Sequence, residues 1–403
     1  MTKRRNQATH SLSHTLKTIR HEPYRIFFPI GIILSWAGVG HWFLLGIEIT
    51  ESYRPIFHAM TQIQGFLTAF AFGFLFTMIP RRTRSAEPGC LLLGIGLAGP
   101  IGCTFFAWHS NWVIAQCFWL LSATSVLVFV LRRLVGKASG RRPPNAFIWL
   151  PIAIVTGIVG SILAGVGGIL GEHYWSVHQL GRDMILQGMF TGLVVGVGAL
   201  ALPMMTRGEP PSDATQSTRD RLIKAAHGLA AVTLVGTFWI ENVASLRVGL
   251  LTRALLIALV LIPTAKLWRP PSKPGLNKWL LWISAWCLPL GYFLAGLFVN
   301  IYKAGLHVSF IGGFALLALS VGSQVVLGHG GFEGLQKGRP WPVILFGGAL
   351  LSALIPRTMM ELQPDALLLW ISIAAGCFLL GTLTWFTFLV PKIIFPSHPN
   401  APP

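Results

Sequence analysis

The chain has 403 residues, of which 53% are hydrophobic and only 11% charged, whereas soluble proteins average about 25% charged residues. So few charges cannot cover a water-facing surface, which excludes a soluble globular protein. Apolar runs of about twenty residues recur, the length at which an α-helix crosses a bilayer, and the short alternating segments of a β-barrel are not seen. The composition therefore predicts an all-α polytopic membrane protein.

Twelve transmembrane helices are expected, one for each long apolar run. Their expected bounds are about 26–46, 57–79, 88–109, 111–134, 146–170, 181–205, 222–241, 247–268, 279–300, 305–328, 341–360 and 365–390. The run at 222–241 is the weakest, because it begins with Lys224 and His227. Since the connecting segments are short, any chemistry is expected in the helix bundle or at its rims.

The chain is expected to form one membrane domain between two short cytoplasmic ends. The N-terminal segment is polar and basic and has no apolar core, so no cleavable signal peptide is expected. No strong internal repeat is expected either. In order, the parts are the N-terminal segment 1–25, the membrane domain 26–392 with six spans over 26–205, an inner loop 206–221 and six spans over 222–390, and the tail 393–403.

The net charge of +18 follows the predicted topology rather than a surface for nucleic acid. Of the 31 lysines and arginines, 25 lie in the two ends or in loops on the same side of the membrane as the ends. This positive-inside distribution predicts that both termini are cytoplasmic. We therefore expect a lipid bilayer, and no nucleic acid, as the partner of the basic residues.

Histidines gather at the predicted outer ends of the spans. His41 ends the first span, His58 begins the second after a short connection, and His307 begins the tenth. A neutral imidazole is the commonest metal ligand, and membrane haem sites can use two such rings from facing helices. Gln62 lies four residues after His58 and shares its helix face. The pattern indicates a cofactor pocket in the outer third of the bundle, although a histidine at a helix end is often only an interface residue.

Other polar groups beside the spans allow two interpretations. The stretch "GRDMILQG" (181–188) begins the sixth span with Arg182 and Asp183, which form either a buried ion pair beside a cofactor or an ordinary helix start favoured by the helix dipole. Arg182 lies on the side of the membrane where haem propionates would need a basic group. His329 follows His307 by 22 residues in one span, about 33 Å of helix rise, so these histidines cannot share a site.

Four segments resemble the motifs of one bacterial membrane-protein family. They are "EPYRIFFPIG" (22–31), "FHAMTQIQGFLTAFAFGFLFTMIPRRT" (57–83), "GRDMILQGMFTGLVVGVGALALP" (181–203) and "GLHVSFIGGFALLALSVGSQVVLGHGGF" (305–332). In this order they are similar to the Pro-aromatic-Arg, His-Ala-His, Gly-Arg-Asp and Leu-His to Leu-Gly-His segments of the NnrS family. The resemblance implies a twelve-span protein of the bacterial inner membrane that carries haem and copper and is linked to nitric oxide, denitrification and protection against nitrosative stress.

The resemblance also assigns roles to residues. His58, His307 and His329 correspond to family histidines, whereas Met60 and Thr61 stand where the family has a second histidine and a glutamate. Met60 still offers a soft thioether that suits Cu(I) or a haem axial position. The predicted cofactor-binding residues are His58, His307, Arg182, His41 and Gln62, and the predicted metal ligands are His58, His307, Met60 and His329. The implied cofactors are haem b and copper, and the implied partners are nitric oxide or another small ligand and a respiratory-chain protein.

Two other classes of function fit the same sequence. Twelve spans in two groups of six are a common arrangement in transporters, and the outer polar side chains could bind a substrate without any metal. A non-catalytic assembly factor for a respiratory complex is the second alternative. The sequence predicts a binding centre but no catalytic residue, so it leaves open whether the protein is an enzyme.

Overall fold

The described part of the computed structural model comprises residues 16–134, 142–209, 213–215 and 217–397, and every regular element in these ranges is a helix. The candidate membrane spans run over Tyr24–Gly46, Pro55–Thr83, Cys90–Trp108, Trp112–Leu134, Asn145–Leu170, Glu172–Arg207, Thr218–Val243, Leu246–Ala265, Leu276–Leu297, Val299–His329, Trp341–Leu362 and Pro364–Ile394. The predicted all-α fold with twelve spans is confirmed, the weak span near 222–241 included.

The spans follow one another in three groups of four. The first group contains α2 (Tyr24–Gly46), then α3 (Pro55–Met60), η1 (Thr61–Leu67) and α4 (Thr68–Thr83), then α5 (Cys90–Trp108) and α6 (Trp112–Leu134). The second contains η2 (Asn145–Ile148) and α7 (Trp149–Leu170), then η3 (Glu172–Tyr174), α8 (Trp175–Asp183), η4 (Met184–Gly188) and α9 (Met189–Arg207), then α10 (Thr218–Val243) and α11 (Leu246–Ala265). The third contains α12 (Leu276–Leu297), then η5 (Val299–Ile301), α13 (Tyr302–His307), η6 (Val308–Ala315) and α14 (Leu316–His329), then α15 (Glu333–Lys337), α16 (Trp341–Ser352) and α17 (Leu354–Leu362), then η7 (Pro364–Ala366) and α18 (Leu367–Ile394).

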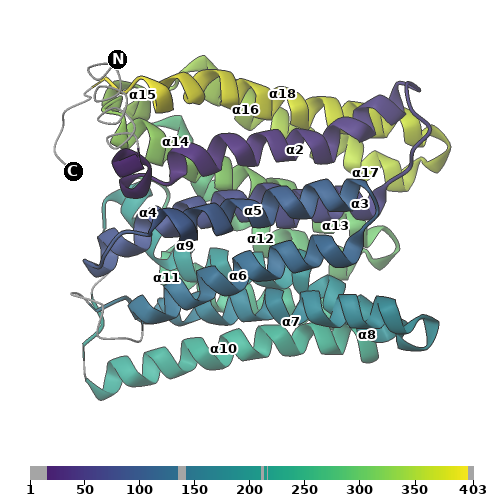
Figure 1. The fold of residues 1–403 in the computed structure, drawn as a ribbon, viewed down its shortest axis with the longest axis horizontal. Helices are drawn as coiled ribbons and strands as arrows, with labels where there is room; N and C mark the ends of the chain where they lie inside the picture. The colour runs from purple at the N-terminus through teal and green to yellow at the C-terminus, as the bar shows by residue number, and fades with distance from the viewer. Residues whose placement is uncertain (1–15, 135–141, 210–212, 216, 398–403) are drawn as a thin grey trace, which may run out of the picture.

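The three groups close into a ring around three inner spans. The last helix of each group packs against the first helix of the next, so that α6 contacts α7, α11 contacts α12, and α18 returns to α2 (Figure 1). The second span of each group is the inner one. Its apolar stretch is 89%, 83% or 78% buried, whereas no other span of the described chain exceeds 61%. Polar groups shielded from lipid are therefore expected mainly on the inner spans.

A sparse sequence repeat accompanies these groups, which is consistent with the expectation that the chain has no strong repeat. Six residues of the first inner span recur 123 residues later in the second: Gln64, Gly65, Thr68, Gly73, Pro80 and Thr83 match Gln187, Gly188, Thr191, Gly196, Pro203 and Thr206. In the third inner span, His307 and Gly322 follow His58 and Gly73 by 249 residues. The repeat is hard to see in the sequence because its identities are few and widely spaced, and only the structure reveals which spans are the inner ones.

Each inner span contains a π-helical segment near the same end of the bundle. These segments, η1, η4 and η6, begin shortly after His58, Asp183 and His307 respectively. A π-helical turn accommodates an additional residue, and such turns occur frequently at functional sites. The three segments therefore direct attention to this end of the bundle.

The two ends of the bundle are named here by what they carry. The histidine end holds α3, α8, α13 and α17, on the right in Figure 1. The terminal end holds the start of α2 and the end of α18, which are joined by a hydrogen bond from Nη1 of Arg25 to the backbone oxygen of Ile393. An even number of spans returns the chain to its starting side, and the assignment of that side to the cytoplasm stays a prediction.

Candidate metal centre

His58 lies on the short helix α3 at the histidine end. Pro55 stands in the first turn of that helix, where a missing N–H costs little. Gly38 lets α2 approach η1 closely, because a side chain at this position would collide with Thr61 and Gln62 of η1. Nδ1 of His58 lies 2.8 Å from the carbonyl oxygen of Gly38. Since a carbonyl only accepts, Nδ1 carries the proton and Nε2 keeps its lone pair.

His307 repeats this arrangement on α13. Its Nδ1 lies 2.7 Å from the carbonyl oxygen of Lys303, one turn earlier in the chain, which again leaves the lone pair on Nε2. His58 and His307 lie at the same end of the bundle, on two different inner spans. Histidines that bind metals usually donate their other ring N–H to a carbonyl or carboxylate, because this orients the ring and fixes its tautomer. Both rings are therefore prepared to bind a metal through Nε2.

His41 lies on α2 beside this pair. Its ring centroid is 6.3 Å from that of His58 and 4.4 Å from that of Trp42. The side chain is only 5% exposed, and neither ring nitrogen has a hydrogen-bond partner among the described residues. A buried polar group without a partner is destabilising. The backbone of Ala37, Gly38 and Arg54 lies near the ring, and a polar partner outside the protein chain would also fit these nitrogens.

Arg357 brings a positive charge to the same place, although the sequence did not single it out. The eleventh span is interrupted at Ala353, between α16 and α17. Pro356 lies in the first turn of α17 and lacks the N–H that would continue the helix across this break, and α17 packs against α13. Nη2 of Arg357 lies 3.3 Å from Nδ1 of His307, and Nη1 lies 2.5 Å from the sulfur of Met360. In the sequence, Arg357 directly follows a proline near the end of an apolar run. Counting the arginines at the outer ends of the spans did not separate it from the others.

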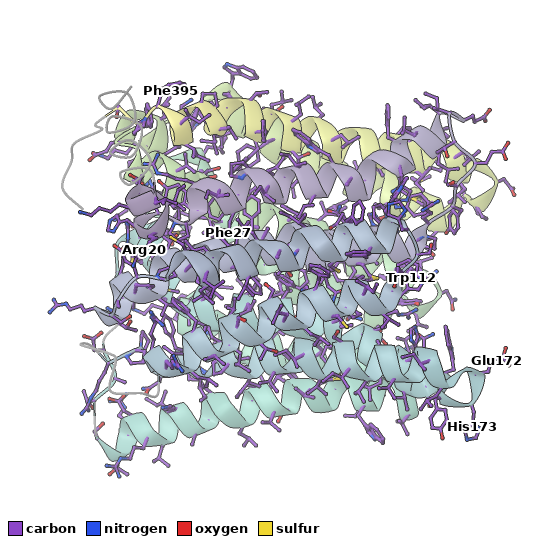
Figure 2. All side chains as sticks on the ribbon, viewed as in Figure 1. Arg20, Phe27, Trp112, Glu172, His173 and Phe395 are labelled. Carbon is purple, nitrogen blue, oxygen red and sulfur yellow. The ribbon has the colours of Figure 1, made fainter. Side chains whose placement is uncertain are left out.

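The other residues predicted at this centre have partners of their own. Gln62 donates from Nε2 to the backbone oxygen of Ser35 at 2.9 Å, and Met60 is half-buried. The side chain of Arg182 is 45% exposed, and its Nη2 lies 3.7 Å from Oδ1 of Asp183. Figure 2 shows His173 farther out, at the tip of the histidine end. Contacts of Gln62, Met60 and Arg182 with a cofactor stay predictions.

His329 lies at the terminal end, where Figure 2 also labels Arg20 and Phe395. Its Nε2 is 2.8 Å from Nη1 of Arg81, and its Nδ1 is 3.3 Å from Oε1 of Glu22. Burial alone would raise the pKa of Glu22, but the hydrogen bond with His329 and the charge of Arg25 lower that pKa to about 2. His329 thus belongs to an ion-paired cluster away from the histidine end, and its role as a metal ligand stays a prediction.

A buried ionic network in the second group also escaped sequence reasoning. Arg253 on α11 is fully buried, and its guanidinium donates to Thr237 at 3.1 Å, Gln187 at 2.6 Å and Glu241 at 2.5 Å. Gln187 lies in η4 and is the repeat counterpart of Gln64. An arginine within an apolar run is a signal of a functional or structural polar site. Its partners come from two other spans, so the sequence does not name them.

Comparison with known protein families matches residues 18–396 to the family described as NnrS protein. The chain belongs to the NnrS family. No match is found among curated proteins. The NnrS match covers nearly the whole chain, so the resemblance predicted from separate motifs is confirmed over the full bundle. The protein is an NnrS-like polytopic membrane protein, and its spans imply a lipid bilayer around it.

The histidine end fits haem better than it fits the copper expected of NnrS proteins. Two imidazoles on different inner spans, each with a free Nε2, are a suitable donor set for haem iron, and Arg357 is a suitable cation beside it. For copper the donors are fewer. The described residues contain no group of three or more His, Cys, Asp or Glu side chains placed to hold a metal ion. Copper therefore stays a prediction without an assigned ligand set.

Proposed function

We propose that this member of the NnrS family is a haem protein of the bacterial inner membrane that takes part in the response to nitric oxide and in protection against nitrosative stress. Its metal centre lies at the histidine end, in the outer third of the bundle. The observation that carries the proposal is the shared tautomer of His58 and His307, each of which donates Nδ1–H to a backbone carbonyl and keeps Nε2 free. The family match supports the same conclusion.

In this proposal His58 and His307 hold a haem b from two different inner spans. A haem held in this way would supply an iron that could exchange electrons with a respiratory-chain partner and could bind nitric oxide or a similar small ligand in place of one of the two imidazoles. The carbonyl groups of Gly38 and Lys303 keep the two imidazoles in orientation. The buried aromatic surroundings of His41 keep water away from the centre.

An optical spectrum of the purified protein, oxidised and then reduced with dithionite, tests the proposal. The wild-type protein is expected to show a haem Soret band, and His58→Ala and His307→Ala are each expected to weaken or shift it. His173→Ala is the matched control, because His173 is an exposed histidine at the same end. A well-folded wild-type protein without a haem band would reject the proposal and favour a metal-free transporter or an assembly factor.

The proposed topology has both termini in the cytoplasm. It is supported by the 25 of 31 basic residues in segments on the side of the termini. A cysteine at position 173 or 397, introduced singly into a chain without its five native cysteines, distinguishes the sides. An impermeant thiol reagent added to intact spheroplasts is expected to label position 173 and not position 397, and the reverse pattern would invert the topology.

A further inference from the structure

The guanidinium group of Arg357 has no good acceptor among the described residues. Its Nε is buried and without a hydrogen-bond partner. Its Nη1 faces the thioether of Met360, which is a weak acceptor. Its Nη2 faces Nδ1 of His307, but that nitrogen already donates its proton to Lys303 and cannot accept another. The contact between Arg357 and His307 is therefore proximity and not a hydrogen bond.

The charge of Arg357 is also uncompensated at close range. Glu361 and Tyr53 are the acidic side chains that interact with it electrostatically, yet no ion pair within 4.0 Å links Arg357 to a carboxylate of the described chain. Lys303 adds a second positive charge near His307. A half-buried cation without a close counter-ion is costly, and a bound anion would offset that cost.

The fold holds this cation beside the two candidate ligands. The interruption of the helix at Ala353 separates α17 from α16, and the packing of α17 against α13 brings Arg357 to His307. Arg357 also interacts electrostatically with His58. A guanidinium presents its donors in a planar fork, which matches the two oxygens of a carboxylate or of nitrite.

We propose that Arg357 is the receptor for a planar oxyanion bound at the histidine end, beside His307. Two sources offer this chemistry. One is a propionate carboxylate of a bound haem, and this source rests on the proposed function. The other is a free small anion such as nitrite or formate, which requires no haem. The two sources make different predictions for the loaded and the unloaded protein.

The first arm of the test uses haem-loaded protein. Arg357→Gln and Arg357→Lys are compared with Arg54→Gln, the matched control, whose arginine lies at the same end but donates to the backbone oxygen of Trp108 at 2.6 Å. If a propionate is the ligand, transfer of haem to excess apomyoglobin is expected to be roughly tenfold faster or more in Arg357→Gln, because a charge-assisted pair is lost. Arg357→Lys keeps the charge without the fork and is expected to fall between, whereas Arg54→Gln matches wild type.

The second arm uses haem-free protein and measures the melting temperature with sodium nitrite or sodium formate at constant ionic strength, with sodium chloride as the reference salt. If a free anion is the ligand, nitrite or formate is expected to raise the melting temperature of wild type and of Arg54→Gln but not of Arg357→Gln. Arg357→Met without added anion is expected to melt no lower than wild type, because it removes an unsatisfied charge. A lower melting temperature would mean that Arg357 already has a partner in the chain, and would overturn the proposal.

The arms separate this proposal from the proposed function. A haem band together with no effect of Arg357→Gln in either arm would overturn the anion receptor and leave the haem protein standing. No haem band together with an anion response that depends on Arg357 would reject the haem protein and support the receptor. A wild-type protein that shows no haem band and whose melting temperature does not respond to nitrite or formate in the second arm would reject both.

Discussion

His307 and His329 lie at opposite ends of the third inner span, 22 residues apart, and their ring nitrogens face different chemistry. His307 donates a hydrogen bond from Nδ1–H to a backbone carbonyl and keeps the lone pair of Nε2. His329 lies between a guanidinium on one side and a carboxylate on the other, so both of its nitrogens already face charged partners. Two histidines of one helix are thus suited to different tasks by what their nitrogens contact.

The difference indicates that the two ends of the bundle have different roles. At the terminal end, ionic contacts tie the start of α2 to α4 and α14, since Glu22 lies 3.6 Å from Arg81 and 3.3 Å from His329. At the histidine end, His41 and Arg357 leave polar atoms unsatisfied. Satisfied clusters stabilise a fold, whereas unsatisfied buried groups indicate a site for something that binds.

The largest expected effect is on haem content, when each of the two histidines is replaced by alanine in turn. His307→Ala removes a free Nε2 and is expected to lower the haem content of the purified protein roughly tenfold or more, as loss of a metal ligand does. His329→Ala is expected to leave haem content within about twofold of wild type, because its ring is engaged by ion pairs at the other end. The pyridine haemochrome assay measures both. Equal loss of haem in the two variants, with unchanged melting temperatures, would contradict the division of roles.

The next largest effect is on stability, and it concerns the buried ionic network around Arg253, which contains no imidazole. Arg253→Ala leaves the carboxylate of Glu241 buried without its cation and is expected to destabilise the protein by roughly 3–5 kcal/mol. Unfolding of detergent-solubilised protein in increasing sodium dodecyl sulfate measures the change. Replacing both residues, as Arg253→Met with Glu241→Leu, is expected to recover most of the loss. Arg247→Ala, on the exposed start of the same helix, is the control. A double variant as unstable as Arg253→Ala would show that the cluster does more than pair two charges.

Much of the fold was predictable from the sequence, because a span needs only length and hydropathy. All twelve spans were found in this way, and the family followed from motifs in the right order. The threefold grouping was not found. It rests on which spans are buried, and a hydropathy pattern does not separate an inner apolar helix from a lipid-facing one.

The site was predictable only in part. His58 and His307 were predicted as ligands because histidines gather at the outer ends of the spans, and this assignment stays a prediction. Their tautomers were not predicted, since the carbonyl groups of Gly38 and Lys303 become partners only once the helices pack. Arg357 needed the same information, because its importance lies in the partners it lacks.

A smaller effect is expected at the terminal end as the pH falls. The pKa of Glu22 is about 2 in the folded protein against an ordinary 4.5, so its contribution to stability is complete above about pH 4.5 and is lost as the pH falls toward 2. Glu22→Gln is expected to lower the free energy of unfolding at pH 7 by roughly 2 kcal/mol, and the difference from wild type is expected to shrink steadily below pH 4.5. Melting temperatures across this range measure it, with Glu333→Gln as an exposed control on the same side. A difference that stays constant down to pH 2 would show that the carboxylate charge is not what stabilises this end.

The smallest effect on stability is expected at His41. The size of this effect shows whether the imidazole serves to bind a ligand or to stabilise the packing of the chain. Both ring nitrogens of His41 are buried and unpaired, and its ring packs against Trp42 and Phe57. In haem-free protein, His41→Phe replaces a polar ring by an apolar one of similar shape, so the free energy of unfolding is expected to change by less than about 1 kcal/mol, or to rise.

The haem-loaded protein is expected to respond differently. If the nitrogens of His41 face a polar group of the bound cofactor, His41→Phe weakens haem retention while the stability of the haem-free protein is preserved. Apomyoglobin transfer and thermal melting, done on the same preparations, measure the two quantities. A loss of stability in the haem-free protein as large as that of an ordinary core polar substitution would mean that the imidazole has a partner within the chain. His41 would then resemble His329, whose ring nitrogens both face partners within the chain.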